Sequence, residues 1–177
     1  MPIIATEGSG KKFPPHPADQ YAGRCIDVID LGMVKTVYDG HEKEQHKVVI
    51  RFFCGQYLEG DEGPEPWFVG RRFTLSLHER GNLRPFLETW RGQKFTEAEL
   101  EGFDLEMLIG APAFLDIQHN TRDDVTYANV MVCTRLPKGM EKPPELPGYV
   151  RVCDRVDEDG DQPSGKPDED DSDSLPF

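Results

Sequence analysis

The sequence predicts an all-β domain with one short helical segment. Several stretches, such as residues 46–54, alternate apolar and polar side chains and are rich in Val, Ile and Phe, as half-buried strands are. Only residues 82–90 show a long helical spacing. With 177 residues, the chain is long enough for one such domain with extensions at its ends.

Five segments have the strand pattern. The first three are residues 21–37, which Gly32 can bend, residues 46–54, which follow the turn signal Asp39-Gly40, and residues 67–77. Residues 55–66 hold three glycines, two prolines and four acids, so we expect an exposed loop there. Residues 112–119 and 126–133 form a hairpin around a turn at residues 120–124.

The helical segment lies between the third and fourth strands. Its apolar residues recur at i, i+3, i+4 and i+7 and predict a core-facing stripe: Leu83, Phe86, Leu87 and Trp90. We expect Asn82 to cap this helix and Gly92 to end it. Thr96 and Glu99 predict the capping box of a second, shorter helix.

The order is therefore three strands, a helical segment and two strands. The OB-fold has this order: it is a five-stranded Greek-key barrel, and its helix lies between strands 3 and 4. Other small β-barrels share the strand count. We expect an OB-fold domain over residues 19–137, a flexible arm over residues 1–18, and a disordered Pro-rich and acidic tail over residues 138–177.

The net charge of −13 is concentrated near the C-terminal end. Residues 154–177 hold ten acidic side chains against Arg155 and Lys166, which leaves −8 there and −5 on residues 1–153. Phosphates respond to the local field of a surface more than to the total charge. The acidic composition therefore does not exclude nucleic-acid binding.

Alternation along the second strand separates an apolar face from a mixed one. Val48, Ile50, Phe52 and Cys54 would face the core. The other face combines cations with a ring, the composition that single-stranded nucleic acid requires, although a solvated strand face is the alternative. In the fifth strand, Ala128, Val130 and Val132 suit the core. The candidate DNA-binding residues are Lys35, Lys47, Arg51, Phe53, Arg72, Thr74, Tyr127 and Asn129.

The sequence contains no catalytic or metal-binding motif. There is no GxSxG, Walker A, GxGxxG or HExxH segment, and the five histidines form no ligand pair. The four cysteines lie far apart without a CxxC pair, as buried free thiols in a reducing cytoplasm would. No signal peptide and no apolar run of transmembrane length occurs. We expect a soluble cytoplasmic protein that is not an enzyme and needs no cofactor or metal.

The end of the sequence combines acids with an apolar tip, in the run Asp168-Glu-Asp-Asp-Ser-Asp-Ser-Leu-Pro-Phe177. This run resembles the C-terminal tail of bacterial single-stranded DNA-binding proteins, which recruits replication and repair enzymes. The resemblance implies that the tip enters a partner's pocket while the acids meet basic residues around it. The candidate partner-binding residues are Asp170, Asp171, Asp173, Leu175, Pro176 and Phe177.

A second resemblance covers residues 20–140. The runs Phe73-Thr-Leu-Ser-Leu-His-Glu79, Asn82-Leu-Arg-Pro-Phe-Leu-Glu-Thr-Trp-Arg-Gly92 and Tyr127-Ala-Asn-Val130 are similar to those of bacteriophage-encoded proteins regarded as single-stranded DNA-binding proteins with an OB-fold. This similarity implies a role in phage DNA replication or recombination inside a bacterial cytoplasm.

Three functions are compatible with these patterns. The leading hypothesis is a non-catalytic protein that coats single-stranded DNA and recruits partners through its tail. An OB-fold adaptor that binds replication proteins but no DNA is the first alternative. The second is an acidic DNA mimic, although its acids should cover the folded surface rather than gather in a tail. The oligomeric state stays open.

Overall fold

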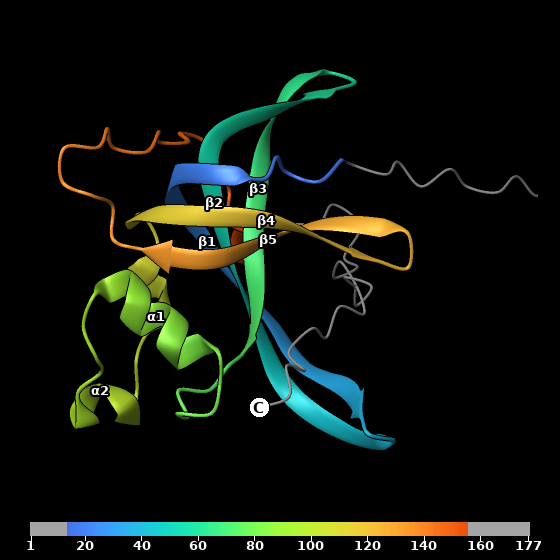
Figure 1. The fold of residues 1–177 in the computed structure, drawn as a ribbon, viewed down its shortest axis with the longest axis vertical. Coiled ribbons are helices and arrows are strands. Elements are labelled where there is room, and N and C mark those ends of the chain that lie inside the picture. Colours follow the sequence, from blue (N-terminus) through green and yellow to red (C-terminus); the bar gives the residue numbers. More distant parts are fainter. Residues whose placement is uncertain (1–13, 156–177) are drawn as a thin grey trace, which may run out of the picture.

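Five antiparallel strands form one curled sheet in the computed structural model, which describes residues 14–155 (Figure 1). Their order across the sheet is β3-β2-β1-β4-β5. Helices α1 (Leu83–Arg91) and α2 (Glu97–Glu101) and the 3₁₀ turn η1 (Leu105–Leu108) follow β3 in the chain. The fold is mostly β, as predicted, and is consistent with an OB-like barrel. The strands are β1 (Asp19–Tyr38), β2 (His41–Gly60), β3 (Gly63–Thr74), β4 (Pro112–Arg122) and β5 (Val125–Thr134).

The β2–β3 hairpin replaces the loop that we expected over residues 55–66. Tyr57 pairs with Pro66 and Glu59 with Pro64, so both strands continue almost to the turn at the tip. β3 is an edge strand of this sheet, and an edge strand tolerates proline because one side of its backbone needs no ladder partner. We expected a loop because proline usually interrupts a strand, but on an edge strand it does not.

Two tight turns determine the other hairpins. Asp39 and Gly40 have φ values of 50° and 75°, and Asp123 and Asp124 have values of 49° and 62°. Two consecutive residues with positive φ are the requirement of a type I′ turn, which matches the twist of the strands that it joins. Gly32 also has positive φ (68°) and lies where the β1–β2 register shifts, so the expected bend is a bulge within one long strand.

Helix α1 closes one end of the curled sheet with its apolar stripe. Trp90 is 4% exposed, lies in the core as predicted, and donates its indole N–H to the carbonyl oxygen of Pro112. The capping box between Thr96 and Glu99 is confirmed. Asn82 occupies the N-cap position of α1 and Gly92 the C-cap position, as expected, but the Asn82 side chain makes no capping hydrogen bond.

Arg71 connects the two edge strands of the sheet. It lies on the apolar face of β3, and its Nη1 donates to the carbonyl oxygens of Val130 and Met131 on β5, both at 3.3 Å. Its guanidinium also lies over the rings of Phe73 and Phe86. No β3–β5 ladder joins the described strands, so this side chain makes a link that backbone pairing makes elsewhere in the sheet.

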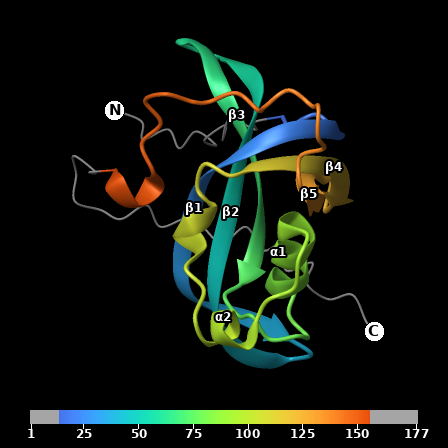
Figure 2. The same ribbon diagram turned by 90° about the vertical axis from the view of Figure 1, so that its left-hand side faces the viewer.

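The chain segment after β5 belongs to the folded part, which corrects the expected start of the tail at residue 138. We call residues 137–155 the strap. Figure 2 shows it in orange, crossing the sheet and ending in the turn η2 (Val152–Asp154). Arg24 donates to the carbonyl oxygen of Pro143, and Pro143 itself is buried. The expected arm is also shorter, because His16 is 2% exposed and contacts the rings of Tyr21 and Trp67.

Asp27 anchors the strap to β1. Its carboxylate is fully buried and accepts hydrogen bonds from the Tyr149 hydroxyl (2.9 Å), the Arg151 Nε (3.2 Å) and the Val152 backbone N–H (2.9 Å). Burial alone would raise the pKa of Asp27, but these three donors outweigh it and hold the pKa below its ordinary value. The carboxylate is therefore ionised whenever the strap is in place near neutral pH.

Replacing Asp27 by Asn should lower the free energy of unfolding by about 1.5–3 kcal/mol at pH 7, because hydrogen bonds to a charged group are lost. A carboxyl whose folded-state pKa is lowered stabilises the fold above its ordinary pKa, about 4, and this contribution disappears as the pH falls through the folded-state pKa. The difference between variant and wild type should therefore shrink in acid, which urea denaturation at pH 7 and pH 3 will measure.

Glu145→Gln is the matched control, since Glu145 lies on the same strap with its side chain 83% exposed. It should leave the unfolding free energy unchanged. Equal stability of Asp27→Asn and wild type at pH 7 would contradict the anchoring role of this carboxylate.

Candidate nucleic-acid interface

The pairing register divides the sheet into a core face and an outer face. Val48, Ile50, Phe52 and Cys54 belong to the hydrophobic core, as the alternation predicted. Residues directly opposite one another in an antiparallel pair share a face, so the partners of Lys47, Val49 and Arg51 lie on the outer face with them. This rule extends the outer face from β2 to β1 and β3.

One half of the outer face carries cations and no acids. We call it the basic face. It consists of the outer-face residues of β1 that follow Asp27, together with their partners on β2 and the partners of those on β3. No carboxylate occurs among them, although the protein as a whole has a net charge of −13. β1 contributes Ile29, Gly32, Val34, Thr36 and Tyr38, β2 contributes His41, Lys43, Gln45, Lys47 and Val49, and β3 contributes Arg72 and Thr74.

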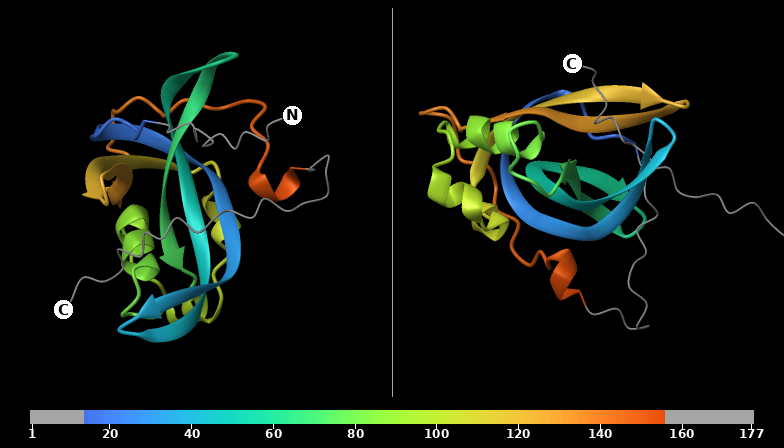
Figure 3. Two further views of the ribbon diagram at one scale, coloured as in Figure 1. Left: turned by 90° about the vertical axis from the view of Figure 1, so that its right-hand side faces the viewer. Right: turned by 90° about the horizontal axis from the view of Figure 1, so that it is seen from below.

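The basic face continues onto a projecting hairpin. In Figure 1 and in the right-hand view of Figure 3, the ends of the β1–β2 and β4–β5 hairpins both project on the side away from α1. Tyr38 at the tip of the β1–β2 hairpin is 66% exposed, and Lys43 is exposed beside it on β2. Sequence reasoning missed both residues because it began the second strand at His46. The Asp39-Gly40 turn signal was the clue, since a tight turn implies paired strands up to it.

Three predicted residues meet on the basic face, but Lys47 is less accessible than expected. Its Nζ donates to the Thr74 hydroxyl at 2.9 Å, and the side chain is only 3% exposed. Arg72 lies two residues before Thr74 on the same face of β3, opposite Val49. We expected Lys47 on an open surface, and its burial leaves it acting on a ligand through its charge more than through direct contact.

Lys35 lies on the other face of the hairpin, apart from Lys47. Its Cα partner is Glu44, and the adjacent pairs on that face are Met33 with His46 and Val37 with Glu42. The bulge at Gly32 made the orientation of Lys35 ambiguous in the sequence. The structure does not bring Lys35 to the basic face.

The strap covers the other half of the outer face at Arg51 and Phe68. Arg51 donates to the Tyr149 hydroxyl at 3.4 Å and lies over the Phe68 ring, which contacts Tyr149. Phe53 is completely buried beside the rings of Phe68 and Tyr57. Our prediction that Phe53 is an exposed stacking ring is wrong, because rings of β2 and β3 enclose it and one of them, Phe68, lies against Tyr149 of the strap.

Tyr127 and Asn129 lie on β5, on the face opposite Ala128 and Val130, as predicted, and both are partly exposed. They belong to the second projecting hairpin, opposite Asn120 and Gln118. The β4–β5 register shifts at Asp116 and Ile117, which reverses the alternation beyond that point. Val132 is therefore 45% exposed and Cys133 is buried, the reverse of what we expected.

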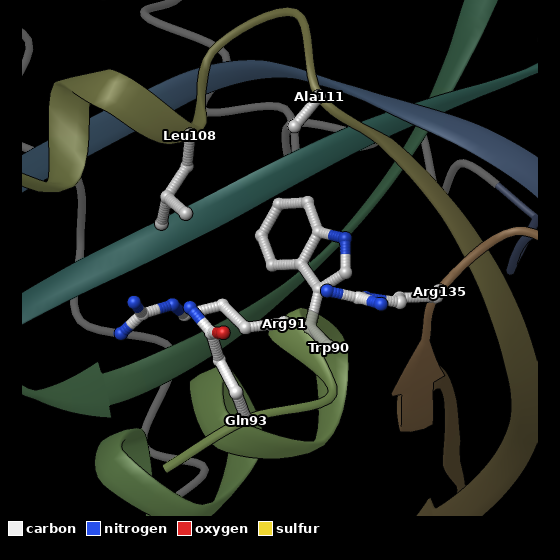
Figure 4. A pocket seen from close by; sticks show the side chains of 6 residues that line it. All are labelled: Trp90, Arg91, Gln93, Leu108, Ala111 and Arg135. Carbon is white, nitrogen blue, oxygen red and sulfur yellow. The ribbon is translucent and has the colours of Figure 1, made fainter. Parts of the chain in front are cut away.

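A separate hollow of about 290 Å³ lies beside α1 (Figure 4). Arg91 at its rim is already engaged by Glu99, at 2.7 Å, and by the rings of Phe95 and Phe103. The side chains that line it include neither a nucleophile nor a general base, so the hollow shows no catalytic arrangement. They are Trp90, Arg91, Gln93, Leu108, Ala111 and Arg135.

Two buried thiols of the described part are unreactive. Burial raises the pKa of Cys25 and of Cys54 to about 12, so these thiols stay protonated and inert. Within residues 14–155, no three side chains of His, Cys, Asp or Glu are grouped to hold a metal ion. None of the described helices is long and apolar enough to span a membrane.

The comparisons with known proteins add no family to this description. No protein-family model matches the chain, and neither a curated protein nor a solved structure matches it. The predicted partner-binding residues of the tail, from Asp170 to Phe177, lie outside the described residues.

Phe53→Ala should lower the free energy of unfolding by about 3–5 kcal/mol, the cost of emptying a fully buried aromatic site. Tyr127→Ala removes a partly exposed ring and should cost much less. Chemical denaturation of both variants will compare them. Equal and small losses would mean that Phe53 is not buried in solution.

Proposed function

We propose that this protein is a non-catalytic single-stranded DNA-binding protein built on an OB-fold. The sheet order β3-β2-β1-β4-β5, the link from Arg71 on β3 to β5, and the helices between β3 and β4 in the chain support the OB-fold assignment. The basic face supports the DNA-binding assignment. In OB-folds, oligonucleotides are bound on the face of strands 2 and 3, and the basic face includes residues of β2 and β3.

The segregation of charge carries the proposal. On the β1–β2 hairpin, the basic face holds Lys43 and Lys47, and the opposite face holds Glu42 and Glu44. Strand alternation thus concentrates positive charge on one surface of an acidic protein. Such a local field attracts phosphates in spite of the total charge.

The mechanism combines charge with apolar and aromatic contacts. Lys43 and Arg72 contact phosphates, and the charge of Lys47 strengthens the field between them. Tyr38 offers an exposed ring at the end of the face for stacking a base, which requires no particular base identity. One such domain covers on the order of 4–16 nucleotides. The strap closes the face at Arg51, so the bound strand runs from Arg72 toward the hairpin tip.

The biological role rests on the resemblances in the sequence. We place the protein in phage DNA replication or recombination, in the cytoplasm of a bacterial host. The acidic tail recruits replication or recombination proteins, with Leu175, Pro176 and Phe177 entering a partner's pocket and Asp170, Asp171 and Asp173 steering the approach. DNA binding and recruitment are then carried by different parts of the chain.

Fluorescence polarisation of a labelled oligo-dT tests the proposal. Binding should be micromolar or tighter at low salt with little base preference. Log K should fall against log salt with a slope of about −2, since single-stranded DNA gives roughly −0.7 for each of three neutralised phosphates. The absence of binding at low salt would refute the proposal, and binding without salt dependence would refute the role of the basic face.

Charge reversal will locate the DNA on one face of the hairpin. Lys43→Glu should weaken the binding of a short oligo-dT and make the salt slope shallower by about 0.7, because one phosphate contact is lost. Lys35→Glu makes the same change of charge on the opposite face and is the matched control. It should shift the affinity far less at moderate salt, where distant charges are screened. Equal losses in the two variants would mean that net charge alone governs binding.

A further inference from the structure

The outer end of the β1–β2 hairpin stands apart from the rest of the sheet. β1 pairs with β4 only over residues 19–24, and β2 pairs with β3 only over residues 47–60. Residues 33–38 and 41–46 therefore pair mainly with each other, apart from a backbone hydrogen bond from the Leu75 N–H to the His46 carbonyl oxygen at the base, and we call them the ribbon. A two-stranded ribbon in water is marginally stable unless one of its faces is covered.

The ribbon face opposite the basic face exposes two large apolar side chains. Met33 is 62% exposed and Val37 is 68% exposed, both on β1 with Lys35 between them. The paired strand contributes His46, Glu44 and Glu42 to the same face. The described part of the protein lays nothing over Met33 or Val37.

One pair of opposite charges on this face is self-complementary. Lys35 and Glu44 lie side by side at its centre, in a directly opposed pair. When two copies of the face stack about a two-fold axis along the ribbon, Lys35 of each copy lies over Glu44 of the other. A symmetric contact of this kind uses the same patch on both subunits. Glu42 is a second acid on this face and has no lysine opposite it, so the contact depends on the two pairs between Lys35 and Glu44.

We propose that the ribbon face formed by Met33, Lys35, Val37, Glu42 and Glu44 is a docking surface for a second copy of this chain. Association covers Met33 and Val37 and gives the ribbon the covered face that it lacks alone. The basic face points away from this contact and stays accessible. The proposal does not depend on DNA binding, since all of its contacts are between copies of the protein.

Sedimentation of the full chain without DNA, over a series of concentrations, tests the proposal. The wild type should form dimers in the micromolar range. Lys35→Glu and Glu44→Lys should each raise the dimer dissociation constant by more than about tenfold, because like charges then face each other. A 1:1 mixture of the two variants should dimerise again, since the two acidic side chains of the first variant then meet the two basic side chains of the second.

The mixture separates a contact between copies from an effect on the fold. The pairing of residues 35 and 44 within one hairpin is unchanged by mixing, so recovery in the mixture can arise only between chains. Lys138→Glu, at an exposed site on the strap, is the charge-matched control and should dimerise like the wild type. A wild type that stays monomeric would overturn the proposal and would leave the face to a different partner. A mixture that fails to dimerise would overturn it as well. Absence of DNA binding would leave this result unaffected.

Discussion

Antiparallel pairing of β1 with β2 is the constraint on which the rest of the structure depends. β1 lies at the centre of the sheet. Its first residues pair with β4, and its last residues pair with β2 in the ribbon. Because side chains on paired strands alternate strictly, one register determines both the core face and the composition of the outer face. A shift of one residue would exchange Lys43 with Glu42 or Glu44 and remove the basic face.

The buried carboxylate of Asp27 decides how much of that outer face is accessible. It draws Tyr149, Arg151 and Val152 onto the sheet, and Tyr149 of the strap then covers Arg51. A buried charge is costly unless donors surround it, so this contact forms only when the strap is correctly placed. The strap thus covers one part of the outer face, and the basic face is the part that it leaves uncovered. The boundary between the two parts lies at Arg51.

Local patterns predicted much of this structure. The core face of β2, the apolar stripe of α1 and the capping box at Thr96 follow from side-chain spacing, which depends only on neighbours along the chain. Three cysteines are buried as expected, but Cys153 on the strap is exposed. The errors occurred where a distant segment intervenes. Phe53 has the alternation of an exposed residue, but the rings of Tyr57 and Phe68 pack against it and it is completely buried. Val132 and Cys133 exchanged faces because a bulge in the pairing with β4 shifts the register.

The sequence by itself determined that this chain forms a mostly-β domain with helices after the third strand, and that its acids gather toward one end. Those properties depend on period and composition, which any reader of the sequence can count. Only the tertiary structure decided which cations share a surface, that Lys35 is separated from Lys47, and that the outer face is half covered. The physical reason is that a face is defined by pairing and by long-range contacts, and neither is encoded in any single segment.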